Sequence, residues 1–201
     1  MRKPTMTSAN SGSRALGSDS ADRIFGAHGG FRDLKAYQVA ELCYDFTCRF
    51  CARYVPVKDR HHDQMVQAAR SGYQNIAEGS EDSGTSKKLE MNLTNIAKSS
   101  LGELERDYRK HLTRRKLRRW NPEDQQFKEA RSLRPATLED AAEWVNRPAQ
   151  RQTAEERAAN LGAILAVQAH WLVERLLDRQ ARDFEGDGGF SERLHHARQG
   201  R

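Results

Sequence analysis

The sequence predicts an all-α protein in which four long helices pack as an antiparallel up-down four-helix bundle. Apolar residues recur at helical spacing in four long stretches, which Gly, Pro and helix-capping residues separate. Val and Ile are sparse and never alternate with polar residues over the length of a strand, so no sheet is expected. Two shorter helical patterns between the third and fourth stretches predict a short helical insert.

Residues 63–108 are the centre of this pattern, because they hold two amphipathic helices joined by a short turn. The helix before the turn, expected over residues 62–78, has one apolar or small face made of Met65, Ala69, Gly72 and Ile76. The helix after it, expected from residue 85 or 86 to about 112 or 118, has a matching face made of Leu89, Leu93, Ile96, Ser100, Leu104, Tyr108 and Leu112. Gly79 is expected to end the first helix in the left-handed conformation, which glycine adopts without strain.

Several segments carry a resemblance to a known family. They read QAARSGYQNIAEG at residues 67–79, NIAKSSLGELE at 95–105 and FRDLKAYQVAELCYDFTCRF at 31–50. The chain resembles the four-helix-bundle protein family that includes the 23S rRNA intervening-sequence proteins and the accessory proteins of diversity-generating retroelements. The segments WNPED, AAEWVNR and GGFSERL resemble its longer branch, the four helix bundle suffix group, so the resemblance covers roughly residues 29–196.

The resemblance implies a bacterial bundle protein associated with RNA-related elements, and a homo-oligomer with the family's pentamer as the expected form. Its most specific part is a motif that holds Asn75, Glu78 and Gly79. We interpret Asn75 and Glu78 as structural, because no nucleophile, phosphate-binding loop or set of metal ligands accompanies them. Asn75 is expected to satisfy backbone groups at the helix end or to reach across to the next helix.

We expect one folded domain over residues 29–201, preceded by a disordered tail over residues 1–28 that is poor in apolar residues. The first helix is expected over residues 33–54, and the last over residues 153–184. The insert, about residues 120–150, holds two predicted helices. The first spans residues 122–132 and starts with Asn121 as N-cap and Pro122 at its first position, and the second spans residues 137–145 and opens with a capping box of Thr137 and Asp140. A C-terminal extension over about residues 185–201 contains a small helix at 190–198.

Composition restricts the class of protein. The chain has 201 residues, of which 37% are hydrophobic and 31% charged, so one soluble domain with a substantial core is expected. No apolar run approaches the ~20 residues that cross a bilayer, and the basic start of the chain lacks the apolar part of a secretory signal. Three cysteines on one helix cannot form a secreted disulfide framework. We therefore expect a cytoplasmic protein with no membrane partner.

The cysteines, Cys43, Cys48 and Cys51, raise the question of a metal site, since His61 and His62 follow the next turn. A zinc site needs four converging ligands, and two cysteines within one rigid helix are an unusual start. Free cysteine is among the most often buried residues. We interpret the three as thiols in or near the core, with a zinc site as the alternative, and expect no metal and no cofactor.

The candidate functional residues are eight Lys and Arg within residues 106–119, where the only acid is Asp107. They are Arg106, Arg109, Lys110, Arg114, Arg115, Lys116, Arg118 and Arg119. Cations near a helix C-terminus complement the helix dipole, but this explains only about two or three of them. Together with a net charge of +6, the cluster indicates an anionic partner, nucleic acid above all; a solvated basic helix end is the alternative.

Three hypotheses for the function follow. The first is a non-enzymatic protein that binds the backbone of RNA or DNA through this basic helix end. The second is a protein-protein interaction scaffold or accessory subunit with no direct nucleic-acid contact. The third is an enzyme in which Tyr108, His111 and the cluster grip a phosphate, but no catalytic residue is assigned because nothing completes an active site. Trp120 is expected either to stack on a base at the edge of the cluster or to pack under the insert.

The last helix supports the oligomer, because its apolar residues occupy more than one face. Leu161, Leu165 and Leu172 form one face, and Ile164, Val167 and Trp171 lie beside it. A four-helix core alone does not require both faces. Contacts between copies that close on themselves would produce a ring.

Overall fold

A computed structural model describes residues 30–148 and 152–187 of the chain. These residues form six α-helices and a short 3-10 helix, with no β-strand among them. The 3-10 helix η1 (Phe31–Asp33) comes first, and the α-helices are α2 (Lys35–Tyr54), α3 (Arg60–Asp82), α4 (Lys87–Arg114), α5 (Gln125–Ser132), α6 (Leu138–Asn146) and α7 (Ala154–Asp187). The predicted all-α class is confirmed. None of the described helices is both long enough and apolar enough to cross a bilayer.

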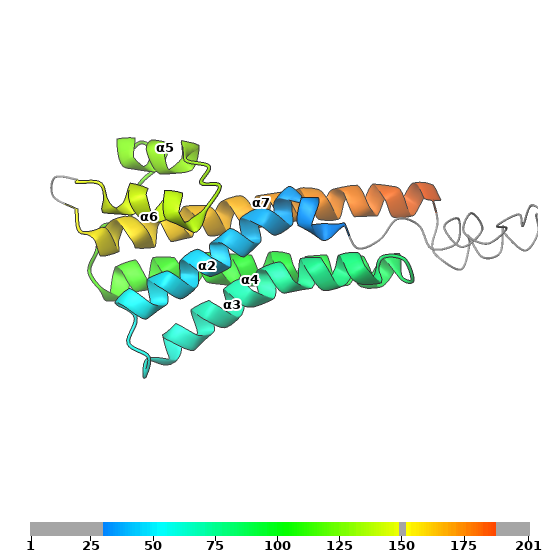
Figure 1. The fold of residues 1–201 in the computed structure, drawn as a ribbon, viewed down its shortest axis with the longest axis horizontal. Helices are drawn as coiled ribbons and strands as arrows, with labels where there is room; N and C mark the ends of the chain where they lie inside the picture. Colours follow the sequence, from blue (N-terminus) through cyan, green and yellow to red (C-terminus); the bar gives the residue numbers. More distant parts are fainter. Residues whose placement is uncertain (1–29, 149–151, 188–201) are drawn as a thin grey trace, which may run out of the picture.

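The four long helices pack against one another along their lengths. Helix α4 lies between α3 and α7, and α2 contacts the same two helices (Figure 1). The two short helices α5 and α6 lie against α7 near its start, at the end of the molecule where α4 finishes. The insert predicted between the third and fourth long helices therefore sits beside the basic residues at the end of α4.

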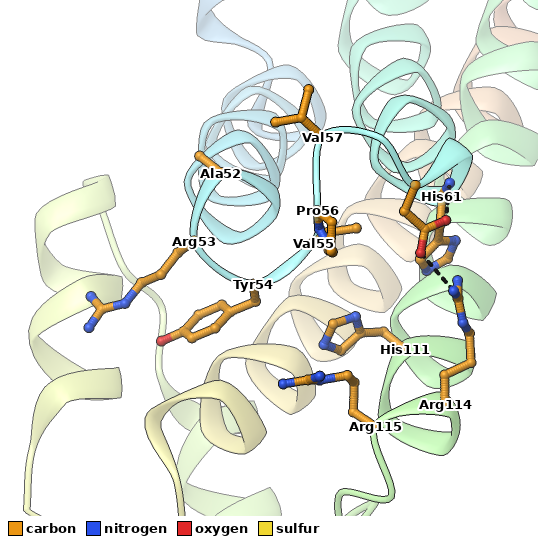
Figure 2. Close-up of a pocket in the computed structure, with 11 residues that line it drawn as sticks. Ala52, Arg53, Tyr54, Val55, Pro56, Val57, His61, His111, Arg114 and Arg115 are labelled. Atoms are coloured by element: carbon orange, nitrogen blue, oxygen red, sulfur yellow. Dashed lines mark hydrogen bonds and ion pairs between the residues drawn. The ribbon is translucent and has the colours of Figure 1, made fainter.

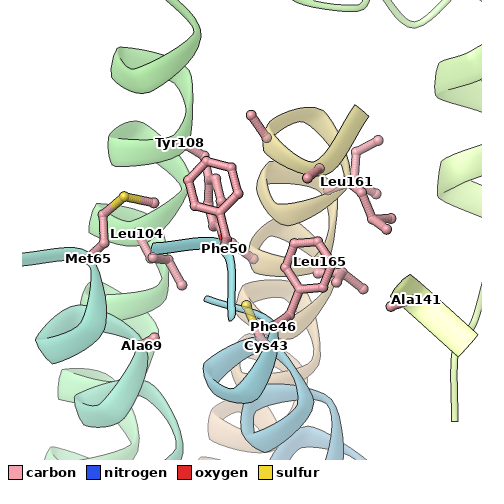
Figure 3. Packing of buried hydrophobic residues seen from close by; sticks show 14 of the residues in the cluster. Cys43, Phe46, Phe50, Met65, Ala69, Leu104, Tyr108, Ala141, Leu161 and Leu165 are labelled. Atoms are coloured by element: carbon pink, nitrogen blue, oxygen red, sulfur yellow. The ribbon is translucent and has the colours of Figure 1, made fainter. Parts of the chain in front are cut away.

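The largest group of buried apolar side chains fills this same end of the molecule (Figure 3). Tyr108 of α4 is fully buried there, with its hydroxyl 3.0 Å from Oγ1 of Thr47 and its ring centroid 5.0 Å from that of Phe50. Its ring lies against the backbone of α7 at Gly162, where an added Cβ would clash with Cζ and lie 2.8 Å from Cε2. Gly162 thus allows α4 and α7 to approach closely around a large aromatic ring.

The prediction that Gly79 ends the second long helix is wrong. Helix α3 continues to Asp82, and Gly79 is buried inside it. A Cβ at Gly79 would lie 3.1 Å from the carbonyl oxygen of Glu90 and 3.3 Å from Cβ of Leu93. Glycine is needed here for the close approach of α4 and not for a left-handed turn. The turn follows Asp82, and Ser86 caps α4 by accepting a hydrogen bond from the backbone N–H of Leu89 at 3.2 Å.

Asn75 contacts its own helix and not the helix end or α4 directly, so both predicted roles are corrected. Its Nδ2 atom donates to the carbonyl oxygen and to Oγ of Ser71, at 2.9 and 3.0 Å. The Ser71 hydroxyl in turn lies 2.9 Å from Oγ of Ser100 in α4. Asn75 therefore supports the contact between α3 and α4 through Ser71, while Glu78 is exposed.

The buried face of α4 is rotated relative to the predicted one. Leu89 and Ile96 are 41% and 48% exposed, and the neighbouring positions Glu90 and Ala97 are buried in their place. Burial of Glu90 is compensated, because its carboxylate accepts hydrogen bonds from Lys87 at 2.9 Å and from Gln180 of α7 at 3.0 Å. Helix α4 packs against α3 and α7 at once, and this position between two helices determines which of its residues are covered.

The insert has the two predicted helices, with one change of boundary. The capping box of α6 is confirmed, since Thr137 accepts from the backbone of Asp140 at 3.1 Å and Asp140 accepts from that of Thr137 at 3.0 Å. Helix α5 starts at Gln125 instead of Pro122, because the Asp124 carboxylate accepts from the backbone N–H of Asn121 at 2.8 Å and holds these residues in a turn. Helix α7 passes the predicted end at residue 184. The predicted tail and the small C-terminal helix lie outside the described residues.

Candidate nucleic-acid interface

All eight basic residues of the cluster are exposed, at the end of α4 and in the segment that follows it. The core-facing residues between them, Leu104, Tyr108 and Leu112, are buried and determine the rotation of the helix. Arg106, Arg109, Lys110 and Arg114 consequently face solvent, as predicted. The cluster is accessible to a partner on the surface of this chain.

Four of the eight cations are paired with carboxylates of the same chain. Arg109 pairs with Glu105 one turn earlier, and Arg118 lies 2.7 Å from Asp124. The other two pairs join distant segments: Arg114 to Asp59 at 2.6 Å, and Arg115 to Glu155 at 2.8 Å. Ion pairs this exposed stabilise a fold only slightly, but they neutralise charge. The cluster is therefore less positive than its sequence indicates.

The other four cations are Arg106, Lys110, Lys116 and Arg119. Within the described residues, no carboxylate lies at ion-pairing distance from any of them. Their charge is uncompensated by the chain itself, so a phosphate group would meet no internal competitor. These four, rather than all eight, are the strongest candidates for contact with a nucleic-acid backbone.

Lys116 has an unusual backbone, with φ at 55°, in the left-handed region. It follows the last residues of α4, and the N–H of Leu117 reaches back to the carbonyl of Leu112 at 2.9 Å, as in a Schellman motif. Glycine is the usual residue at this position, because a side chain costs about 1 kcal/mol there. A lysine kept at a strained position beside other cations fits a role for its side chain in binding.

His111 and Glu155 lie under the cluster and hold Arg115. The Nε2 atom of His111 is 3.0 Å from Oε1 of Glu155, which also accepts from Nε of Arg115 at 2.8 Å. Burial lowers the pKa of His111, and this effect outweighs the opposite effect of Glu155. The hydrogen bonds from Arg115 and His111 keep the pKa of Glu155 below its usual value. Glu155 is thus ionised and His111 neutral at neutral pH.

Sequence reasoning missed Asp59 and Glu155 as partners of the cluster. Asp59 precedes α3 and caps it, accepting from the backbone N–H of His61 at 3.0 Å. An Asp just before a helix is a recognisable N-cap signal, so its place at the start of α3 was open to prediction. Its pairing with Arg114 depends on how α3 and α4 are packed, and no local pattern encodes it.

Trp120 packs under the insert, which confirms one of its two predicted roles and rules out the other. Its side chain is 3% exposed and its ring meets that of Trp144 edge-on, with centroids 6.0 Å apart. Its backbone N–H donates to Oδ1 of Asn160 in α7 at 3.0 Å. A ring covered in this way cannot stack on an unpaired base.

The cysteines do not converge with the neighbouring histidines. Cys43 and Cys51 are buried, and burial raises the pKa of each thiol to about 12. The sulfur of Cys51 lies 3.9 Å from that of Met65, and Cys48 is only partly buried. Over residues 30–148 and 152–187, no three or more His, Cys, Asp or Glu side chains are grouped as metal ligands.

No protein-family model, curated protein or solved structure matches this chain. The resemblance to the four-helix-bundle protein family accordingly stays a prediction from the sequence. A helical fold hosts many unrelated functions, so the function has to be argued from the basic end itself.

Proposed function

We propose that this chain is a non-enzymatic, antiparallel up-down four-helix-bundle protein that binds the backbone of RNA or DNA. The binding site is the basic end of α4, and the observation that carries the proposal is the uncompensated charge of Arg106, Lys110, Lys116 and Arg119. The RNA-related elements of the family that the sequence resembles support the same function.

Binding of this kind is electrostatic and reads little of the base sequence. Lysine and arginine replace the counterions around each phosphate, so the affinity falls steeply as the salt concentration rises. Contacts to phosphates position a protein on a strand, whereas contacts to base edges supply specificity. With Trp120 covered, the cluster presents cations and no aromatic stacking surface of its own.

Reversing the four uncompensated cations to Glu is expected to weaken nucleic-acid binding by at least about tenfold, since each lost phosphate contact also flattens the salt dependence by roughly 0.9 in log–log slope. Fluorescence anisotropy with labelled RNA and DNA, at about 50 and 200 mM salt, measures both effects. The helical circular dichroism should be unchanged, because none of the four side chains is buried.

A second quadruple variant controls for total charge. Lys35, Arg70, Lys88 and Arg179 are also exposed, and reversing them changes the net charge by the same amount. They lie on the other helices or at the opposite end of α4, so this variant should bind almost as well as the parent. Equal loss of binding in both variants would mean that net charge alone, and not the cluster, attracts nucleic acid.

The second candidate function is that of a protein-protein interaction scaffold built on a homo-oligomer, with a pentameric ring as the expected form. The observation that favours it is the exposure of Val167 and Trp171 on α7, at 48% and 52%. Large exposed apolar side chains, Trp above all, are typical of interfaces. In a ring, each copy would add its own basic cluster to a shared surface.

For the oligomer, light scattering should give a multiple of the 22.9 kDa chain mass, and Trp171→Glu should reduce it to the mass of one chain. The reason is that a buried, unpaired carboxylate at an interface is costly. Val57→Glu is the matched control, because Val57 is 76% exposed and lies in the turn before α3. A parent protein that stays at the mass of one chain at every concentration would contradict the oligomer.

A further inference from the structure

A pocket of about 550 Å³ opens beside the basic cluster, between the end of α2, the turn that leads into α3 and the end of α4 (Figure 2). Its volume is within the range of pockets that hold small organic ligands. In Figure 2, Arg53 and Tyr54 lie on one side and His111, Arg114 and Arg115 on the other. Residues from three helices therefore surround one space.

The polar lining of this pocket is mostly basic. Arg53, Arg114 and Arg115 contribute guanidinium groups, and Asp59 is the one carboxylate that lines it. The ion pairs to Asp59 and Glu155 hold two of these guanidinium groups in place. Arginine donors that are fixed in orientation are well suited to phosphate oxygens.

His61 lines the same pocket and has a vacant hydrogen-bonding position. Its side chain is 4% exposed, and its buried Nε2 atom has no hydrogen-bond partner among the described residues. Buried polar atoms are nearly always paired, so an unpaired one beside a pocket points to a ligand. The Nδ1 atom is 3.9 Å from Oδ1 of Asp107, too far to fix the tautomer by a hydrogen bond, and Nε2 is therefore able to carry a proton and donate it.

We propose that this pocket binds a phosphate monoester, supplied by the phosphorylated end of a nucleic-acid strand; this deepens the proposed function and rests on it. A terminal phosphate carries up to about two negative charges at neutral pH, against one for a phosphate within the backbone, and suits a lining of fixed arginines. The remaining volume has room for the terminal sugar and base, beside the ring of Tyr54. The exposed cations of the cluster bind the strand that leads away from the pocket.

The experiment compares single-stranded oligonucleotides of one sequence that carry a 5′-phosphate, a 3′-phosphate or only hydroxyl groups. The parent protein is expected to bind one phosphorylated form about tenfold or more tightly than the hydroxyl form, the effect of a hydrogen bond to a charged group. Adenosine monophosphate and inorganic phosphate are tested beside them as competitors, with adenosine as the reference. These arms distinguish a strand end from a free nucleotide and from a free ion.

Two variants test the pocket itself. Arg53→Gln removes an exposed guanidinium that lines the pocket and should abolish the preference for the phosphorylated strand without loss of stability. Lys58→Gln is the matched control, because Lys58 is exposed in the adjacent turn but does not line the pocket, and it should keep the preference. His61→Gln should also abolish it, with the circular dichroism spectrum as a check of folding.

Equal binding of phosphorylated and unphosphorylated strands by the parent would overturn the pocket proposal and leave the cluster as a backbone-binding site. Binding of adenosine monophosphate, but of no oligonucleotide, would keep the monoester pocket and reject the proposed function. A phosphate preference that Arg53→Gln and His61→Gln both retain would place the monoester elsewhere and overturn the assignment.

Discussion

Replacing Gly162 with alanine is expected to destabilise the protein by about 2–3 kcal/mol and to lower Tm by roughly 4–12 °C. The added Cβ would clash with the ring of Tyr108, which Phe50 and Thr47 confine from the other side. A fully buried ring cannot move aside without displacing its neighbours. Thermal unfolding followed by circular dichroism measures the change.

Gly102→Ala is the matched control, because Gly102 is also inside a long helix. A Cβ there would lie 3.5 Å from Nη1 of Arg106 and 3.7 Å from Cδ2 of His170, both ordinary contacts. Alanine is a better helix former than glycine, so this variant should be more stable than the parent by about 0.5–1 kcal/mol. The two substitutions are chemically identical and should have effects of opposite sign.

A double-mutant cycle assigns the cost of Gly162→Ala to the ring. In a Tyr108→Leu background the clash is removed, so Gly162→Ala should cost much less than it does in the parent. The same cost in both backgrounds would show that the close approach of α4 and α7 at this point does not depend on Tyr108.

Asn160→Ala should have the second large effect on stability, a loss of about 1–3 kcal/mol. Asn160 is buried in α7, where it accepts from the backbone N–H of Trp120 at 3.0 Å and donates to the carbonyls of Arg118 and Glu156 at 2.9 Å each. Alanine leaves backbone groups of the segment after α4 without these partners. Urea unfolding measures the loss, and amide hydrogen exchange at Trp120 should become faster.

Asn75→Ala is the comparison, and it should cost less than about 0.5 kcal/mol. Asn75 is only partly buried, and its two hydrogen bonds go to Ser71 within the same helix. Water can replace a partner there more easily than inside the contact between α7 and the segment after α4. If Asn75→Ala proved as costly as Asn160→Ala, burial would not be the property that separates the two asparagines.

The sequence by itself was sufficient for features that depend on neighbouring residues. The 3.6-residue period located the long helices, and the capping box of Thr137 and Asp140 predicted the start of α6 to within a residue. The exposure of the basic cluster also followed from local spacing, because Leu104, Tyr108 and Leu112 determine which side of α4 faces the core. Such features are encoded within one or two helical turns.

Tertiary structure decided the features that depend on which helices lie side by side. Gly79 resembles a helix stop in sequence, yet α3 continues past it because α4 crosses closely at that point. Local spacing indicated eight available cations, but the folded chain brings Asp59 and Glu155 to two of them from distant segments. The pocket with His61 likewise exists only where α2, α3 and α4 meet. Packing depends on the shapes and rotations of whole helices, and no short stretch of sequence contains that information.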